Sequence, residues 1–191
     1  MRAKVAFCIK FLFLIVILWL VGYLGYRYFY MTKEVESPQK QAIPKAPPVK
    51  LSKIDYILIE KKKRQMTVFH KDKPLRVYRI ALGFSPVGHK TEQGDGKTPE
   101  GMYKIVAKNP KSRFHLSIKI SYPSTADRKI AAEKGVHPGG EIMIHGLGAQ
   151  GFLGEKHRLR DWTLGCIAVT NEEITEVYPY IDVGTKVEIR P

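Results

Sequence analysis

The chain has little cysteine: only Cys8 and Cys166 occur among its 191 residues. Cys8 lies in or beside an apolar N-terminal stretch and Cys166 lies far downstream, so we expect the two thiols in different phases and predict no disulfide between them. One unpaired thiol is unusual in an exported domain. This scarcity favours a reactive Cys166 over the alternative, an inert cysteine that packs as a small hydrophobic residue.

Several common motifs are also absent. The stretch over residues 83–101 contains Gly96-Lys97-Thr98, but Thr91 stands where the phosphate-binding loop has its first glycine, so we do not expect such a loop. No pair among His89, His115, His137 and His157 has the close spacing of zinc ligands, so we predict no metal ion and no cofactor. No internal repeat is visible, which excludes a repeat architecture.

Acidic residues are few: 18 Asp and Glu stand against 32 Lys and Arg, for a net charge of +14. Residues 1–50 hold eight of the basic and two of the acidic residues, so the excess extends into the rest of the chain. The charge favours a polyanionic partner, such as a cell-wall polymer or an anionic membrane surface; a basic domain without a charge-selected partner is the alternative. No nucleic-acid-binding motif accompanies it, so we predict no nucleic-acid partner.

Residues 1–30 predict a single-pass membrane anchor. From Val5 onward, 22 residues are apolar except for Lys10, close to the ~20 residues that span a bilayer. Gly22 and Gly25 are not spaced as a small-x-small cleavage site, which favours an uncleaved anchor over a cleaved signal peptide. The basic N-terminus is expected in the cytoplasm, so the rest of the chain would face the periplasm or cell wall from the inner (cytoplasmic) membrane.

Residues 31–50 contain four prolines and no apolar periodicity, which predicts an extended linker. Residues 51–191 then carry short apolar runs separated by polar or Gly/Pro stretches, and such runs are typical of strands. The predicted strands cover residues 54–60, 66–69, 75–82, 102–107, 118–122, 142–145, 166–169 and 186–189. We therefore expect one mainly β domain after the linker.

Two short helices are expected in this domain. One covers residues 125–134, with Thr125 as its cap and Gly135 at its end. The other opens at the Thr-Asn-Glu-Glu capping box of residues 170–173. The basic stretch of residues 61–64 is interpreted as the solvated tip of a hairpin rather than a binding patch.

The segment of residues 161–171 holds the candidate nucleophile. Cys166 follows Thr163-Leu164-Gly165 and precedes an apolar strand, a pattern typical of a mounted nucleophile. Upstream, the strand of residues 142–145 ends on His145, followed by Gly146. Because a cysteine nucleophile needs a base nearby, His145 is the natural candidate.

The order of these motifs resembles the L,D-transpeptidase catalytic domain of the YkuD type. That family shows a His-Gly, a gap of about this length, and then Ser/Thr-His-Gly-Cys. The resemblance covers roughly residues 54–191 and includes further matches at residues 94–101, 120–123 and 138–140. Two positions depart from the family: Leu164 stands where His is frequent, and Ala168 where Arg or Asn is frequent.

The resemblance implies a mixed β-sandwich or barrel-like fold and a cysteine-dependent L,D-transpeptidase. Such an enzyme acts on peptidoglycan stem peptides through an acyl-enzyme, either cross-linking them or attaching amines or proteins to the wall. Cys166 would be the nucleophile, and His145 the base, oriented by the carbonyl of Gly146. The backbone amides of Cys166, Gly165 and Leu164 are expected to hold the oxyanion.

Thr163, Trp162 and His115 are the predicted substrate contacts. Alternatives to transfer remain open: water as acceptor would make the same site an L,D-carboxypeptidase or endopeptidase, and loss of activity would leave a wall-binding module. If His145 lies within hydrogen-bond reach of Cys166, its imidazolium form is expected to lower the pKa of the thiol.

Overall fold

The structure is a computed structural model that describes residues 19–25 and 51–191. The chain divides into two units, Met1–Ala46 and Pro47–Pro191. In the first, residues 19–25 are helical, and the rings of Trp19 and Tyr23 stack with their centroids 6.0 Å apart. None of the helices within the described residues has the length and hydropathy needed to span a bilayer. The predicted linker, and the predicted anchor except for residues 19–25, lie outside the described residues.

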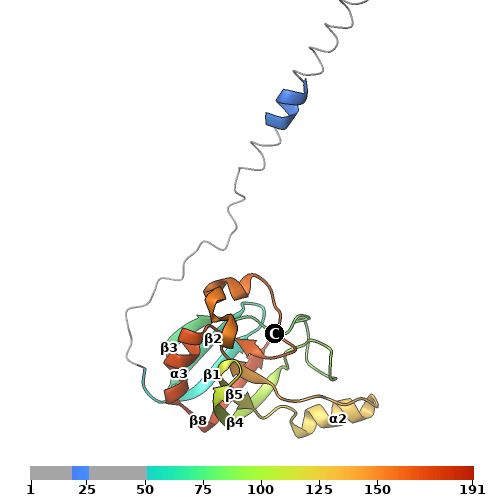
Figure 1. Cartoon of the computed structure of the whole chain (residues 1–191). Coiled ribbons are helices and arrows are strands. Elements are labelled where there is room, and N and C mark those ends of the chain that lie inside the picture. The colour runs from blue at the N-terminus through green and yellow to red at the C-terminus, as the bar shows by residue number, and fades with distance from the viewer. Residues whose placement is uncertain (1–18, 26–50) are drawn as a thin grey trace, which may run out of the picture. The chain divides into compact units, whose positions relative to one another are not determined.

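The second unit is an eight-stranded sheet with few helices (Figure 1), as expected for a mainly β domain. Its strands are β1 (Ile54–Glu60), β2 (Gln65–His70), β3 (Lys73–Arg79), β4 (Gly101–Ser112), β5 (His115–Ile120), β6 (Met143–His145), β7 (Ile167–Ala168) and β8 (Ile181–Arg190). They lie in the order β3-β2-β1-β8-β4-β5-β6-β7. The β1–β8 and β6–β7 pairs are parallel, and the other neighbours are antiparallel.

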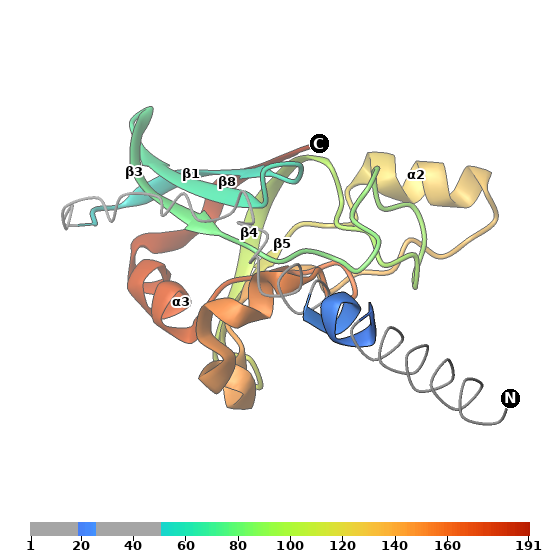
Figure 2. The same cartoon turned by 90° about the horizontal axis from the view of Figure 1, so that it is seen from above.

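Strand β4 joins the two halves of the sheet. Its first residues, from Gly101 to Lys104, pair with β8, and the residues from Ile105 onward pair with β5. The β4–β5 register shifts between Ile105 and Ala107, and such irregularities bend a strand and increase its twist. One strand can therefore serve two differently oriented halves, which is what curls the sheet in Figure 2.

The two ends of the sheet are joined by the residues that follow β3. Ala81 and Ala168 exchange both backbone hydrogen bonds, at 3.0 and 2.9 Å, and the Phe84 amide donates to the Thr163 carbonyl at 2.9 Å. We call this pairing of residues 81–84 with Thr163 and Ala168 the closing seam. It connects the β3 end of the sheet to the β7 end and makes the fold barrel-like.

Four helical elements complete the domain: α2 (Thr125–Glu133), η2 (Gly148–Leu159), α3 (Asn171–Val177) and η3 (Tyr178–Tyr180). α3 covers the core with Ile174 and Val177, both fully buried. α2 lies at the opposite end of the domain from α3 (Figure 2). The 3-10 stretch η2 was not expected from the sequence; it contains the non-helical Gly154, whose φ is +46°, and lacks a regular apolar period.

The helix boundaries agree with the sequence except at one cap. The capping box that opens α3 is confirmed, because the Thr170 and Glu173 side chains each accept from the other's backbone amide. The expected cap of α2 was wrong by one residue: Ser124, not Thr125, caps it, in a box with Asp127. Asp127 closes this box from N3, so the residue three positions earlier becomes the cap.

The basic turn is not simply a solvated tip, and this part of the interpretation was wrong. Lys62 and Lys63 are exposed, but Lys61 is only 2% exposed. Its amine donates to the carbonyls of Gly88 (2.6 Å) and Thr98 (2.8 Å) and forms an ion pair with Glu100 at 2.8 Å. Burial lowers the pKa of Lys61, while the Glu100 carboxylate opposes that shift. Lys61 thus fastens the loop between β3 and β4 to the sheet.

Arg64, at the other end of the turn, fastens the cysteine segment. Its guanidinium makes a two-pronged contact with Asp161, through Nε at 2.9 Å and Nη2 at 2.7 Å. The Asp161 carboxylate in turn accepts from the Leu82 amide at 2.8 Å. Two of the basic residues in this turn therefore hold the segments on either side of the closing seam.

We predict that Lys61→Ala lowers the free energy of unfolding by about 3 kcal/mol, because it leaves the buried Thr98 carbonyl and the largely buried Glu100 carboxylate without their partner. Lys62→Ala is the matched control, since the neighbouring exposed lysine should change stability by less than about 0.5 kcal/mol. Urea unfolding of the full-length variants, followed by circular dichroism, measures both. Equal stabilities of the two variants would show that the Lys61 contacts contribute nothing.

Candidate active site

The loop before Cys166 is closed by a side chain and requires a glycine. The Thr163 hydroxyl donates to the Cys166 carbonyl (2.7 Å) and accepts from the Gly165 amide (3.1 Å). Gly165 has φ +129°, and a Cβ there would lie 2.6 Å from the Lys97 carbonyl oxygen. Any side chain at this position would both strain the backbone and collide with the loop that Lys61 holds. The predicted substrate contact Thr163 thus uses its hydroxyl within the loop.

His145 is the last residue of β6 and is only 1% exposed. Its Nδ1 lies 2.6 Å from the carbonyl oxygen of Gly146. A carbonyl can only accept, so Nδ1 carries the proton and Nε2 keeps its lone pair. The imidazole is therefore held in the tautomer that can take a proton from another group.

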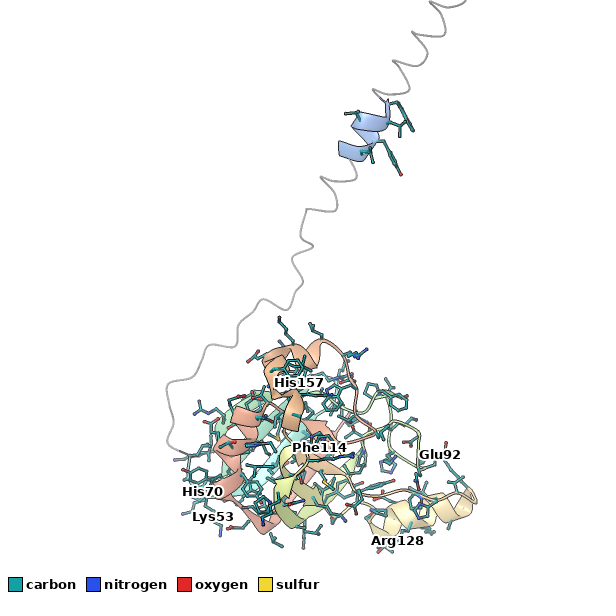
Figure 3. The ribbon with its side chains drawn as sticks, viewed as in Figure 1. Lys53, His70, Glu92, Phe114, Arg128 and His157 are labelled. Atoms are coloured by element: carbon teal, nitrogen blue, oxygen red, sulfur yellow. The ribbon has the colours of Figure 1, made fainter. Side chains whose placement is uncertain are left out.

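Aromatic rings fix the orientation of this imidazole. Phe114 stacks on it with the ring centroids 4.3 Å apart and the planes at 24°. Trp162 meets it edge-on at 6.0 Å, and His157 in η2 packs edge-on against the same indole at 6.5 Å. Figure 3 shows Phe114 near the middle of the domain and His157 on the 3-10 segment. Burial and the nearby charge of Arg158 lower the pKa of His157 to about 4, so it packs there as a neutral ring.

Cys166 and His145 open into one pocket of about 710 Å³. Three further predicted residues also line it, namely Trp162, Thr163 and Leu164. The rest of its wall comes from Asn109, Ser112, Arg113, Phe114, Ser117, Gly140, Glu141, Ile142 and Met143. The structure therefore gathers side chains from β4, β5, β6 and the cysteine loop around a single thiol. Gly146 and Gly165 do not line this pocket. The Gly146 carbonyl orients His145, and Gly165 allows the close backbone approach before Cys166.

The thiol of Cys166 is held as a hydrogen-bond donor. It points to the carbonyl oxygen of Glu141, with Sγ and O 3.5 Å apart. Glu141 has φ +57°, which is uncommon for a residue with a Cβ and turns its carbonyl toward the sulfur. This contact suits the protonated form of the cysteine, because a thiolate has no proton to donate.

The electrostatics of the pocket also favour a neutral pair. Burial raises the pKa of the Cys166 thiol, and the Met143 amide only partly opposes this shift. Burial likewise lowers the pKa of His145, against the opposing contact to Gly146. The pKa of the thiol therefore shifts upward, opposite to the direction expected from a neighbouring imidazolium, because burial penalises the charged form of each group.

His115, a predicted substrate contact, lies outside the pocket. Its Nε2 lies 2.8 Å from the Thr175 hydroxyl in α3, whereas its neighbour Phe114 faces His145. Phe114 precedes β5 and His115 has φ +77°, so the backbone turns between them and only Phe114 lines the pocket. His89 and His137 are also engaged elsewhere, since each accepts a backbone amide at its Nδ1, from Glu100 and Gly139 respectively.

Asn171 is a positioning residue that the sequence did not single out. Its Oδ1 accepts from the amides of Leu147 (2.7 Å) and Gly148 (3.1 Å), and its Nδ2 donates to the Gly148 carbonyl. These contacts fix the turn directly after His145 and Gly146. The only signal in the sequence was its place beside a capping box, which accounts for helix initiation and not for this second role.

The match to known families agrees with this geometry. Residues 54–189 match the family YkuD, described as the L,D-transpeptidase catalytic domain. This match spans more than half of the chain, so the chain belongs to the YkuD L,D-transpeptidase catalytic domain family.

Individual relatives support the assignment. The chain is 30% identical to the Escherichia coli K12 protein named "Putative L,D-transpeptidase YafK" over 132 residues, which are 66% of this chain and 46% of that protein. The fold of this chain is similar to that of the helical cell shape determining protein Pgp2 from Campylobacter jejuni, with a TM-score of 0.57 and 26% identity. The match covers 72% of this chain and 48% of that chain. Bd1075 from Bdellovibrio bacteriovorus gives a TM-score of 0.52 with the same identity and coverage. The chain thus spans about half the length of these relatives.

We predict that alkylation of Cys166 by iodoacetamide has its pH midpoint above the ordinary thiol value of about 8.5, because only the thiolate reacts and burial disfavours it. Rates at Cys166 are followed by peptide mass spectrometry in the full-length protein across pH. The same cysteine in the urea-unfolded chain is the control and should titrate near the ordinary value. A folded-state midpoint below 8.5 that moves upward in His145→Ala would contradict the neutral pair.

Proposed function

We propose that this chain is a cysteine-dependent L,D-transpeptidase that acts on peptidoglycan stem peptides through an acyl-enzyme. The observation that carries the proposal is the shared pocket of Cys166 and His145, in which the Gly146 carbonyl leaves His145 Nε2 ready to accept a proton. Membership of the family supports the same chemistry.

In the first half-reaction, the thiol proton of Cys166 passes to His145 Nε2 as the substrate binds. The sulfur attacks the carbonyl carbon between the diamino acid and the terminal D-Ala. The C–N bond then breaks, and the imidazolium returns its proton to the leaving amine of D-Ala. Because the resting pair is neutral, the charges separate during the reaction rather than in the free enzyme.

The developing oxyanion requires backbone donors near the sulfur. The Gly165 amide already donates to Thr163 Oγ1 at 3.1 Å, so it points into the loop. We assign the oxyanion instead to the amides of Cys166 and Leu164. The Leu164 side chain is 76% exposed and lines the pocket, where it offers an apolar contact to the acceptor.

In the second half-reaction, an amine of another stem peptide or of a protein loses a proton to His145 and attacks the thioester. The C–S bond breaks, and the sulfur recovers its proton from the imidazolium. Water in place of the amine would release a shortened stem peptide, as a carboxypeptidase does. In both cases the thiol is regenerated.

We also propose that residues 1–30 anchor the protein in the cytoplasmic membrane and residues 31–50 act as a linker, so that the catalytic domain faces the cell wall. The motivation is the apolar N-terminal stretch with its basic flank. An anchored protein stays with membranes during carbonate and high-salt extraction. Release of the intact full-length chain under these conditions would rule the anchor out.

The assay for the proposed activity uses the full-length protein and purified tetrapeptide muropeptides, with products read by mass spectrometry. We expect cross-linked dimers together with free D-Ala. Free D-Ala without dimers would identify a carboxypeptidase instead, and cleavage elsewhere within the stem peptide an endopeptidase. Unchanged substrate with retained binding would identify a wall-binding module.

Substitutions of Cys166 and His145 test their proposed roles as nucleophile and general base. Cys166→Ser is expected to abolish product, and His145→Ala to lower kcat/KM by roughly 10²- to 10⁴-fold, the usual contribution of a general base. Cys8→Ser is the matched cysteine control and should leave the activity unchanged. Activity that survives in Cys166→Ser would exclude the thiol as nucleophile.

A further inference from the structure

The pocket wall carries a guanidinium that the proposed mechanism does not use. Arg113, at the turn between β4 and β5, lines the pocket with Cys166 and His145. Within the part of the chain that the structure describes, no carboxylate forms an ion pair with this guanidinium. An unpaired cation beside a nucleophile is a feature that a ligand can complement.

The position of this cation is fixed by stacking. The Arg113 guanidinium lies over the Phe114 ring, with Cζ 4.7 Å from the centroid, and the same ring stacks on His145. The Phe114 ring thus contacts both the guanidinium and the imidazole. Stacking on an aromatic face restrains an otherwise mobile side chain, so less freedom is lost when the guanidinium binds a ligand.

The other charged groups in the pocket do not compensate the positive charge of Arg113. Glu141 is the one acidic side chain among the lining residues, and it is paired with Lys119. Cys166 and His145 are both held neutral by burial. The net charge around the reacting atoms therefore comes from Arg113, and it favours an anionic group on the ligand.

We propose that Arg113 binds a carboxylate of the stem peptide and thereby selects substrates that carry a free carboxylate close to the scissile bond. The planar fork of a guanidinium matches a carboxylate through two parallel hydrogen bonds, so it sets the register of the peptide as well as its affinity. The proposal rests on the proposed function. Two carboxylates of the substrate have this chemistry: that of the terminal D-Ala, and the side-chain carboxylate of a diamino acid such as diaminopimelate.

The test compares the full-length wild type with Arg113→Gln and Arg113→Lys on three tetrapeptides: the free acid, the D-Ala carboxamide, and the diamino-acid side-chain carboxamide. We expect Arg113→Gln to lower kcat/KM on the free acid by roughly 10- to 100-fold, the range of a charge-assisted hydrogen bond. Arg113→Lys keeps the charge but loses the planar fork, so its kcat/KM should fall between those of the wild type and Arg113→Gln. Lys111→Gln is the matched control, because this exposed lysine near the end of β4 does not line the pocket.

The amides identify which carboxylate is bound. Amidation of the bound carboxylate should slow the wild type by a similar factor and should have little further effect on Arg113→Gln. Amidation of the other carboxylate should lower the rate of both proteins equally. If both amides act equally on the wild type and on Arg113→Gln, the proposal is overturned.

A binding measurement separates this proposal from the proposed function. The three peptides are titrated calorimetrically into Cys166→Ala and into Cys166→Ala/Arg113→Gln, so that no turnover is needed. Weaker binding of one amide to the first variant alone supports the carboxylate site even if the wild type proves inactive. Equal affinities of both variants for all three peptides would refute it, whatever the activity.

Discussion

The closing seam is the constraint on which the rest of the structure depends. The hydrogen bonds of residues 81–84 to Thr163 and Ala168 join the ends of the sheet, and they bracket the loop that presents Cys166. This close approach is possible because Gly83 and Gly165 have no side chains: a Cβ on Gly83 would lie 3.1 Å from the Gly165 Cα. The proposed nucleophile, Cys166, therefore lies where the barrel-like sheet closes.

Two basic residues that do not line the pocket, Lys61 and Arg64, hold the segments of the closing seam in place. Lys61 fastens the loop whose Lys97 carbonyl backs Gly165, and Arg64 fastens Asp161 at the start of the cysteine segment. Part of the basic excess of the chain is thus structural rather than reserved for partners. Inside the pocket the situation is reversed, because burial keeps the thiol and the imidazole neutral and leaves a single stacked cation.

Features encoded by local patterns were predictable from the sequence, including β1 at its observed bounds and the capping box at Thr170. The site was only partly predictable. The motif order pointed to Cys166 and His145, but the side-chain direction at the β4–β5 turn depends on long-range packing, so His115 was expected where Phe114 lies. The direction of the thiol pKa was missed for a related reason: burial is a property of the folded pocket that no short motif reveals.

The central claim is that Cys166 becomes covalently acylated by a stem peptide. The most direct measurement is the intact mass of the full-length protein after acid quenching of a reaction with tetrapeptide, followed by peptide mapping. The account predicts an adduct equal to the tetrapeptide less D-Ala, located on Cys166 and absent from Cys166→Ser. Product formation with no adduct at any quench time, or an adduct on another residue, would contradict it.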